Sequence, residues 1–120
     1  MPKTALIVDD ATVVRQLCAM TLKRIGYTVI EGVNGKDALN KTEGINLDLV
    51  ITDLNMPEMD GIELIKQLRQ RKECRFVPII VLSTISQQQK VNEGKAAGAS
   101  GWLFKPFDAN KLLETLKKIV

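Results

Sequence analysis

The sequence contains no histidine and only two cysteines among its 120 residues. Protein zinc sites are built chiefly from Cys and His, and a disulfide framework needs several cysteines, so neither is expected. Cys18 and Cys74 are expected to be reduced, ordinary side chains. The longest apolar stretch, 76–82, is interrupted by Pro78 and is far shorter than the roughly 20 residues of a membrane helix. No apolar leader is evident at the N-terminus, so we expect a cytoplasmic protein that does not associate with membranes.

Aromatic residues make up only 4% of the chain, and the net charge is only +3. The densest basic run, Lys66 to Arg75, includes Glu73 and lies where a helix is expected to end, a place where cations complement the helix dipole. A nucleic-acid surface usually adds aromatic residues or a recognition helix, and neither is evident. We therefore expect no nucleic-acid partner.

The length and composition predict one domain spanning residues 1–120, with no appended effector domain. Hydrophobic residues make up 45% of the chain and charged residues 26%, which suits a compact core of about 100 to 150 residues. Short β-branched runs alternate with segments of helical period, a pattern typical of a parallel sheet covered by helices. The predicted strands are Ala5 to Val8, Thr28 to Glu31, Leu49 to Thr52, Ile79 to Ser83 and Gly101 to Phe104. The first, third and fourth are apolar throughout, which indicates burial on both faces.

The segments between these strands predict helices. The first should end at Gly26 and bury one face, made of Val13, Val14, Leu17, Thr21 and Ile25. Further helices are predicted over 36–42, over 62–68, and from an N-cap at Asp108 to Ile119. The segment Gln87 to Ala97 has Val91 as its only strong apolar residue, so we expect a marginal and mobile helix there.

Repeated strand-helix units bring the C-terminal ends of all strands to one edge of the sheet, where open α/β sheets bind ligands. Asp9 and Asp10 follow the first strand, and Asp53 follows the third. Three carboxylates so close together repel one another unless a cation intervenes, and hard oxygen ligands with room for water suit Mg²⁺. Asp10 taken alone has a second explanation, as a helix N-cap.

Asp53 is held at the sheet edge by a buried strand, and a carboxylate can attack phosphorus to give an acyl phosphate. The charge on the phosphoryl oxygens then needs fixed cations and donors. Mg²⁺, the Lys105 ammonium and the Ser83 hydroxyl fit those three tasks. Taken singly, Ser83 is equally well explained as a helix cap and Lys105 as a surface charge.

The sequence closely resembles the response-regulator receiver domains of two-component signalling, in particular the stand-alone chemotaxis type, over essentially its whole length. The motifs that carry the resemblance are Asp9-Asp10, the segment from Asp53 to Gly61, Ser83, Ala97-Gly98-Ala99 and Lys105-Pro106-Phe107. The resemblance implies an α/β fold of the flavodoxin-like (βα)5 type. This fold is a three-layer sandwich with a parallel five-stranded sheet. The strand order 2-1-3-4-5 is implied by the resemblance alone.

The resemblance also implies a role for each matching residue. Asp53 resembles the phosphoacceptor, and the implied Mg²⁺ ligands are Asp10 directly, Asp9 through water, Asp53 itself and the backbone carbonyl of Asn55. Ser83 resembles the hydroxyl that turns toward the phosphoryl group, and Lys105 the cation beside it. Trp102 resembles the aromatic residue that reorients with that hydroxyl.

Four features of these motifs refine the comparison. Serine stands at position 83 where threonine is commoner, and Thr84 stands where alanine is frequent. Trp102 replaces a tyrosine or phenylalanine, and indole is bulkier than either ring. The Lys105-Pro106 bond is expected to be cis, as in the family.

The resemblance implies a phospho-accepting switch rather than an enzyme. Because the chain has no histidine, the phosphoryl donor is expected to be a separate histidine kinase or phosphotransfer protein. A downstream protein is expected to bind the face made by the fourth helix, the last strand and the last helix, in chemotaxis or a related pathway.

Three alternatives remain beside this hypothesis. The first is an intermediate receiver of a phosphorelay. The second is an aspartate-nucleophile phosphatase of the haloacid dehalogenase type, which needs an acidic residue where Asn55 stands. The third is a flavodoxin, whose phosphate-binding first loop Asp9 and Asp10 would oppose by charge repulsion.

Overall fold

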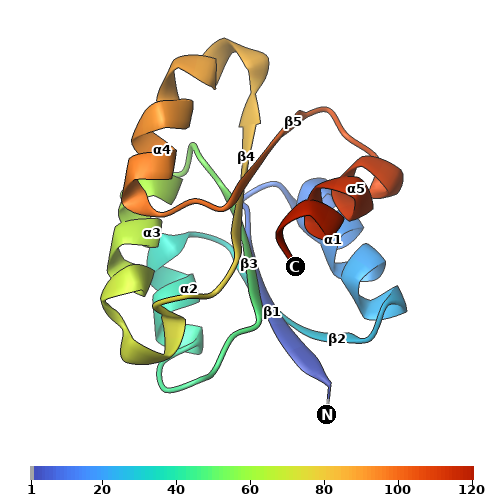
Figure 1. Ribbon diagram of the computed structural model, residues 1–120, viewed down its shortest axis with the longest axis vertical. Helices are drawn as coiled ribbons and strands as arrows, with labels where there is room; N and C mark the ends of the chain where they lie inside the picture. The colour runs from blue at the N-terminus through green and yellow to red at the C-terminus, as the bar shows by residue number, and fades with distance from the viewer. Residues whose placement is uncertain (1) are drawn as a thin grey trace.

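A computed structural model describes residues 2–120, which form a parallel sheet between two layers of helices (Figure 1). Its five strands lie in the order β2-β1-β3-β4-β5, which confirms the predicted flavodoxin-like topology. The strands are β1 (Lys3–Val8), β2 (Tyr27–Gly32), β3 (Leu49–Asp53), β4 (Ile79–Thr84) and β5 (Gly101–Lys105). All the predicted strands are present, and each extends one or two residues beyond its predicted range at one end or, for β2, at both ends. Asp53 and Lys105 are therefore the last residues of their strands.

The helices are α1 (Thr12–Arg24), α2 (Gly35–Lys41), α3 (Gly61–Gln70), α4 (Val91–Ala97) and α5 (Ala109–Ile119), with 3-10 segments η1 (Lys72–Cys74) and η2 (Ile85–Lys90). In Figure 1, α1 and α5 lie on one side of the sheet and α2, α3 and α4 on the other. No helix among the described residues is long and apolar enough to cross a membrane.

Each face of the sheet has its own hydrophobic core, because successive strand residues point to opposite faces. Leu49 and Ile51 of β3 pack with residues of α1 and α5, whereas Val50 packs with residues of α3. On β4, Ile79 and Val81 belong to the α3 side. This alternation determines the face toward which each residue at the strand ends points.

Three helices begin at polar caps that the sequence provides. The side chains of Asn34, Asp60 and Asp108 accept hydrogen bonds from the backbone N–H groups three residues later. Each bond satisfies one of the unpaired donors at a helix start. The predicted N-cap at Asp108 is confirmed.

The predicted buried face of α1 is partly wrong. Val13 and Ile25 are 79% and 47% exposed, and the fully buried residues of the helix include Cys18 and Leu22, one turn apart. Ile25 is the C-cap, which follows the last helical residue, Arg24. Val13 instead borders an apolar hollow of about 410 Å³ beside Lys105.

The segment predicted as one weak helix over Gln87 to Ala97 has two parts. The 3-10 segment η2 contains no buried residue, and α4, only 7 residues long, buries only Gly94. The helix ends at Gly98, whose φ of 119° is left-handed and therefore suits glycine. The paucity of apolar residues thus shortens the α-helix to its second half.

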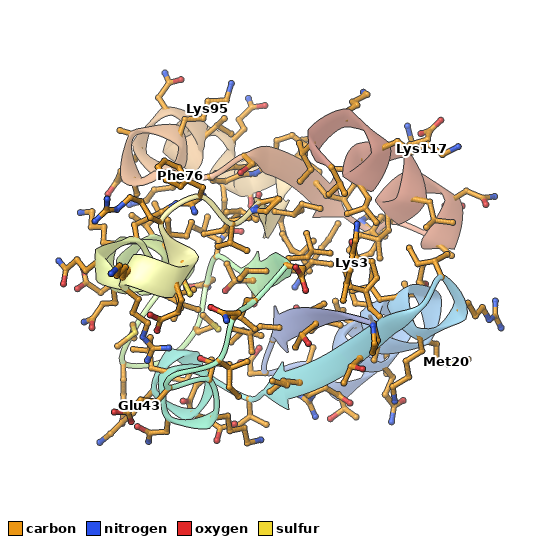
Figure 2. The ribbon with its side chains drawn as sticks, turned by 60° about the horizontal axis from the view of Figure 1, so that its bottom comes forward. Lys3, Met20, Glu43, Phe76, Lys95 and Lys117 are labelled. Carbon is orange, nitrogen blue, oxygen red and sulfur yellow. The ribbon has the colours of Figure 1, made fainter. Side chains whose placement is uncertain are left out.

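The basic run at the end of α3 serves partly as internal bracing. Arg69 donates to the carbonyls of Cys74 and Gly98, and Arg71 donates to the carbonyl of Leu39. The helix ends inside the run, as predicted. Elsewhere on the molecule, the charged side chains of Lys95 and Lys117 extend into solvent (Figure 2).

Candidate functional site

The ends of three strands place charged side chains over the same face of the sheet. Asp53 follows Leu49 and Ile51 at alternate positions of β3, so it shares their face, toward α1 and α5. Lys105 follows Leu103 in the same way on β5, and Asp9 follows Ile7 just beyond β1. The strand alternation alone therefore brings these three groups together.

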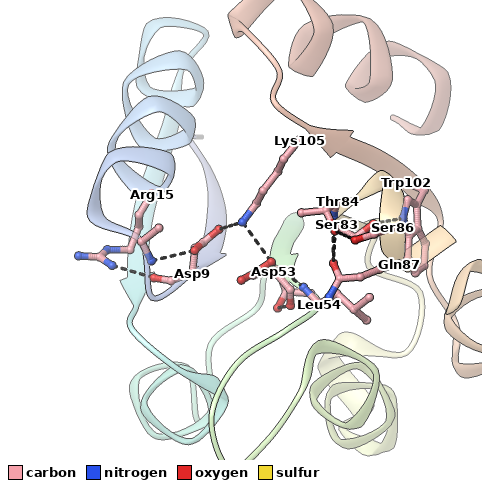
Figure 3. Close-up of polar contacts among 12 residues, drawn as sticks. Asp9, Arg15, Asp53, Leu54, Ser83, Thr84, Ser86, Gln87, Trp102 and Lys105 are labelled. Carbon is pink, nitrogen blue, oxygen red and sulfur yellow. Dashed lines mark hydrogen bonds and ion pairs between the residues drawn. The ribbon is translucent and has the colours of Figure 1, made fainter.

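The carboxylates of Asp9, Asp10 and Asp53 each place an oxygen within 4.8 Å of the others. Lys105 lies among them: its Nζ is 3.2 Å from Oδ1 of Asp53 and 3.1 Å from Oδ2 of Asp9 (Figure 3). Asp9 and Asp53 are buried, and Asp10 is exposed. The predicted gathering of these four residues at one edge of the sheet is present in the structure.

Asp9 has one oxygen that the protein does not satisfy. Its Oδ1 accepts a hydrogen bond from the backbone N–H of Ala11, at 2.9 Å. Its Oδ2 is fully buried, and the only charged partner that the described residues offer it is the Lys105 ammonium, 3.1 Å away, which Asp53 shares. A buried, unsatisfied carboxylate oxygen beside two further carboxylates suits a hard cation. The donor set therefore fits Mg²⁺.

The electrostatics of Asp53 and Lys105 reflect this crowding. Burial raises the pKa of Asp53, and the Asp9 carboxylate raises it further, while Lys105 opposes both effects. Burial lowers the pKa of Lys105, but the carboxylates of Asp53 and Asp9 outweigh it and leave that pKa above its ordinary value. Lys105 is therefore a permanent cation that only partly offsets the carboxylates around it.

The backbone after Asp53 holds the carboxylate in one orientation. The N–H of Leu54 donates to Oδ1 of Asp53 at 2.9 Å, and no described residue donates to Oδ2. A side chain at Gly61 would place its Cβ 2.4 Å from the carbonyl oxygen of Asp53, so only glycine lets α3 begin this close to the strand. Asn55 is exposed on the intervening loop, and its carbonyl remains a predicted ligand.

Ser83 and Trp102 lie on the opposite face of the sheet from Asp53. Ser83 follows Ile79 and Val81 at alternate positions of β4, on the α3 side. Its hydroxyl accepts a hydrogen bond from the indole Nε1 of Trp102 at 2.7 Å, as Figure 3 shows. The two residues predicted to move together are thus directly bonded here, and the turn of Ser83 toward a phosphoryl group stays a prediction.

The sequence did not predict a role for two further residues, Gly94 and Arg15. Gly94 of α4 provides the seat for the indole: a Cβ there would lie 2.3 Å from Cζ3 of Trp102. The signal was a lone glycine inside a helical segment, which often marks a close packing contact. Arg15 of α1 donates to the carbonyl of Asp9 and pairs with Glu31, and no motif distinguishes it from an ordinary surface arginine. The Lys105-Pro106 bond is cis, as expected.

Residues 5–117 match the response regulator receiver domain. The chain belongs to this family. The phosphatase and flavodoxin alternatives are therefore set aside. The chemotaxis protein CheY of Thermotoga maritima is 38% identical over 120 residues, which cover 99% of this chain and 98% of that protein. CheY-3 of Vibrio cholerae is 35% identical over 115 residues, covering 95% of this chain and 88% of the relative.

Solved structures of receivers agree with this assignment. The chemotaxis response regulator CheY4 of Vibrio cholerae superimposes with a TM-score of 0.93 at 40% identity, over all of both chains. The receiver domain of the sensor histidine kinase PA1611 of Pseudomonas aeruginosa gives a TM-score of 0.86 at 27% identity and covers 99% of this chain and 98% of its own. That structure has a magnesium ion coordinated in its active-site cleft. Receivers like these act as signalling switches, and this chain shares their fold.

Proposed function

We propose that this receiver accepts a phosphoryl group on Asp53 from a separate histidine kinase or phosphotransfer protein and thereby switches a protein-binding surface. These 120 residues contain no histidine, so the donor imidazole must lie outside them. The similarity to CheY proteins favours chemotaxis as the pathway. A cytoplasmic location and a single domain over residues 1–120 are part of this proposal.

The observation that carries the proposal is the arrangement around the carboxylate of Asp53. One oxygen, Oδ1, accepts from the Leu54 N–H and contacts Lys105, while Oδ2 has no donor among the described residues. Oδ2 is thus free to attack phosphorus. The fixed Lys105 ammonium lies where charge develops on the phosphoryl oxygens, which is how phosphoryl transfer is accelerated.

The transfer step forms a bond from Oδ2 of Asp53 to phosphorus and breaks the phosphorus–nitrogen bond of the donor phosphohistidine. The leaving imidazole keeps the electron pair of that bond and takes up a proton. When bound by Asp9, Asp10, Asp53 and the Asn55 carbonyl, Mg²⁺ supplies a further positive charge for the phosphoryl oxygens. Lys105 holds the anionic acceptor in place before and after transfer.

The switched surface in this proposal is the face of α4, β5 and α5. A groove of about 270 Å³ lies along β5 and α5, with Trp102, Phe104 and Lys111 in its lining. Trp102 is hydrogen-bonded to Ser83, which follows Leu82, the register partner of Asp53, on β4. In this proposal a change at Asp53 reaches that surface through Ser83 and Trp102.

The test is phosphorylation by acetyl phosphate with Mg²⁺, followed by mass spectrometry of the modified peptide. We expect modification of Asp53, none in Asp53→Asn, and full modification in the control Asp108→Asn, which keeps a good helix cap. A phosphoryl group found chiefly on Ser83 or Thr84, or undiminished modification in excess chelator, would contradict the proposal.

A second experiment separates a terminal switch from a phosphorelay intermediate. Purified histidine kinases from the same organism are offered as donors, and the labelled receiver is then mixed with histidine phosphotransfer proteins. A terminal switch loses its phosphoryl group to water, whereas a relay intermediate passes it to a second histidine. Rapid transfer to such a protein would favour the relay.

A further inference from the structure

We infer that Arg15 is a positioning residue for the cation site: with Glu31 it clamps the loop between β1 and α1 that carries Asp9 and Asp10. This inference rests on the proposed function, because it concerns how the protein prepares its Mg²⁺ ligands. Arg15 Nη1 donates to the carbonyl oxygen of Asp9 at 2.7 Å, and its Nε donates to Oε1 of Glu31 at 3.1 Å (Figure 3 draws the first contact).

The clamp fixes the polar groups of Asp9 one by one. The Asp9 N–H donates to the carbonyl of Gly32 at 3.2 Å, Oδ1 accepts from Ala11, and the carbonyl accepts from Arg15. Only Oδ2 is left without a hydrogen bond, and it is buried beside Asp53 and Lys105. With the carbonyl of Asp9 bonded to Arg15 and Oδ1 bonded to Ala11, Oδ2 is the oxygen of Asp9 that remains for a cation.

The same bond fixes the direction in which Asp10 leaves the loop. The carbonyl of Asp9 belongs to the peptide group that joins it to Asp10, so holding that oxygen sets the plane of the peptide. The helix that follows begins at Thr12, and its N-cap residue, Ala11, makes no side-chain cap hydrogen bond. The guanidinium reaches back from the first turn of α1 and fixes this loop by donating to the Asp9 carbonyl.

Glu31 anchors the other end of the clamp and balances its charge. Its carboxylate pairs with Arg15, whose side chain is only 14% exposed, and its backbone carbonyl accepts from Lys41 of α2 at 2.8 Å. Lys41 is in turn paired with Asp37. The metal-ligand loop is thus tied through Arg15 and Glu31 to the end of β2 and to the second helix.

A positioning role and a purely electrostatic role predict opposite signs. The positive charge of Arg15 repels a cation and partly cancels the negative charge of Glu31, so on charge alone its removal would tighten Mg²⁺ binding. If Arg15 positions the loop, its removal weakens binding, on the scale of the 10- to 100-fold losses seen when residues that orient metal ligands are changed. The sign of the effect therefore decides between the two.

The experiment is a Mg²⁺ titration of the full chain, followed by the amide NMR shifts of Asp10 and Asn55. We expect Arg15→Met to raise the Mg²⁺ dissociation constant about 10-fold, at the low end of that range. Arg24→Met is the control, since Arg24 is an exposed arginine of the same helix and the change in charge is equal. Glu31→Gln, which keeps an oxygen that accepts from Nε, should raise the constant less than Arg15→Met.

A dissociation constant of Arg15→Met equal to or below that of the wild type would overturn the inference. If Arg15→Met does not fold, as its amide spectrum would show, Arg15→Lys takes its place. A single ammonium cannot hold both Asp9 and Glu31 in the two-pronged way of a guanidinium, so the constant should rise severalfold, and no rise would overturn the inference. Failure of the wild type to bind Mg²⁺ would instead refute the proposed function.

Discussion

The two faces of the sheet are built differently, and the difference separates chemistry from signalling. On the face that carries α1 and α5, helices of 13 and 11 residues, short contacts hold Asp9, Asp53 and Lys105 in place at the edge of the sheet. On the other face, Ser83 is bonded to Trp102, and Trp102 packs against Gly94 of α4, a helix of 7 residues that follows a 3-10 segment with nothing buried. A rigid site preserves its geometry, whereas a loosely packed element can have two arrangements of similar energy.

The largest effect should be the difference in phosphorylation rate between two variants, each with one substitution on a different face of the sheet. Lys105→Ala removes the fixed cation from the reacting group and should slow phosphorylation by acetyl phosphate about 100-fold or more. Trp102→Phe changes only the other face and should leave that rate within about twofold, because no contact of the indole reaches Asp53. Rates measured by mass spectrometry check both variants. An equal decrease of the phosphorylation rate in both variants would show that the face of Trp102 also contributes to the chemical step.

The second effect is the pH dependence of the free energy of unfolding that the crowding of Asp53 causes. Because burial and Asp9 raise the pKa of Asp53, the folded protein holds a proton there more readily than the unfolded chain does. The stability contributed by that proton is present below the ordinary value of 3.8 and is lost as the pH rises through the folded-state pKa. In chelator, wild type should therefore lose stability relative to Asp53→Asn as the pH rises toward neutrality.

Magnesium provides the control for this effect. At 100 times its dissociation constant, Mg²⁺ should add about 2.7 kcal/mol to the free energy of unfolding of the wild type and less to that of Asp53→Asn. Urea unfolding with and without Mg²⁺ at neutral pH measures both. A wild type that is more stable than Asp53→Asn without metal at neutral pH would refute the electrostatic account.

The chemical face was easier to predict from the sequence than the signalling face. Asp9, Asp53 and Lys105 follow apolar strands, and the ends of parallel strands share one edge, so strand assignment alone brings them together. The bond between Ser83 and Trp102 depends on a rotamer, and the seat at Gly94 depends on how α4 crosses β5. Neither is local in sequence, so neither leaves a periodic pattern. The exposure of Val13 was mispredicted because apolar character alone does not fix the rotation of a helix.

The third prediction tests the close contact on the signalling face. Alanine favours a helix over glycine by about 1 kcal/mol, so Gly94→Ala would stabilise α4 if nothing lay against it. The indole does lie there, and overpacking costs roughly 1 to 3 kcal/mol, so we expect a net loss of about 1 kcal/mol and a changed Trp102 emission. Lys95→Ala, at an exposed position of the same helix, is the control. Higher stability in Gly94→Ala would mean that the indole does not occupy this seat.

The smallest effect should come from Ser83→Ala, which removes the hydroxyl but leaves both cores intact. Losing the acceptor for Nε1 of Trp102 should lower the free energy of unfolding by about 1 kcal/mol and shift the emission of the unphosphorylated protein. Trp102 is the only tryptophan, so its fluorescence reports this site without ambiguity. Ser86→Ala is a matched control, because the Ser86 hydroxyl contacts Thr84 rather than the indole.

The same pair of variants tests whether the two faces communicate. Beryllofluoride with Mg²⁺ mimics the phosphoryl group on Asp53, and if Ser83 turns toward it, the bond to Trp102 must break. Emission or quencher access should therefore change in the wild type and in Ser86→Ala, and much less in Ser83→Ala. An equal response in all three would show that the signal bypasses Ser83. No response in any of them, with Asp53 demonstrably occupied, would make Trp102 a packing residue, because a population shift of even a few kcal/mol would alter its surroundings.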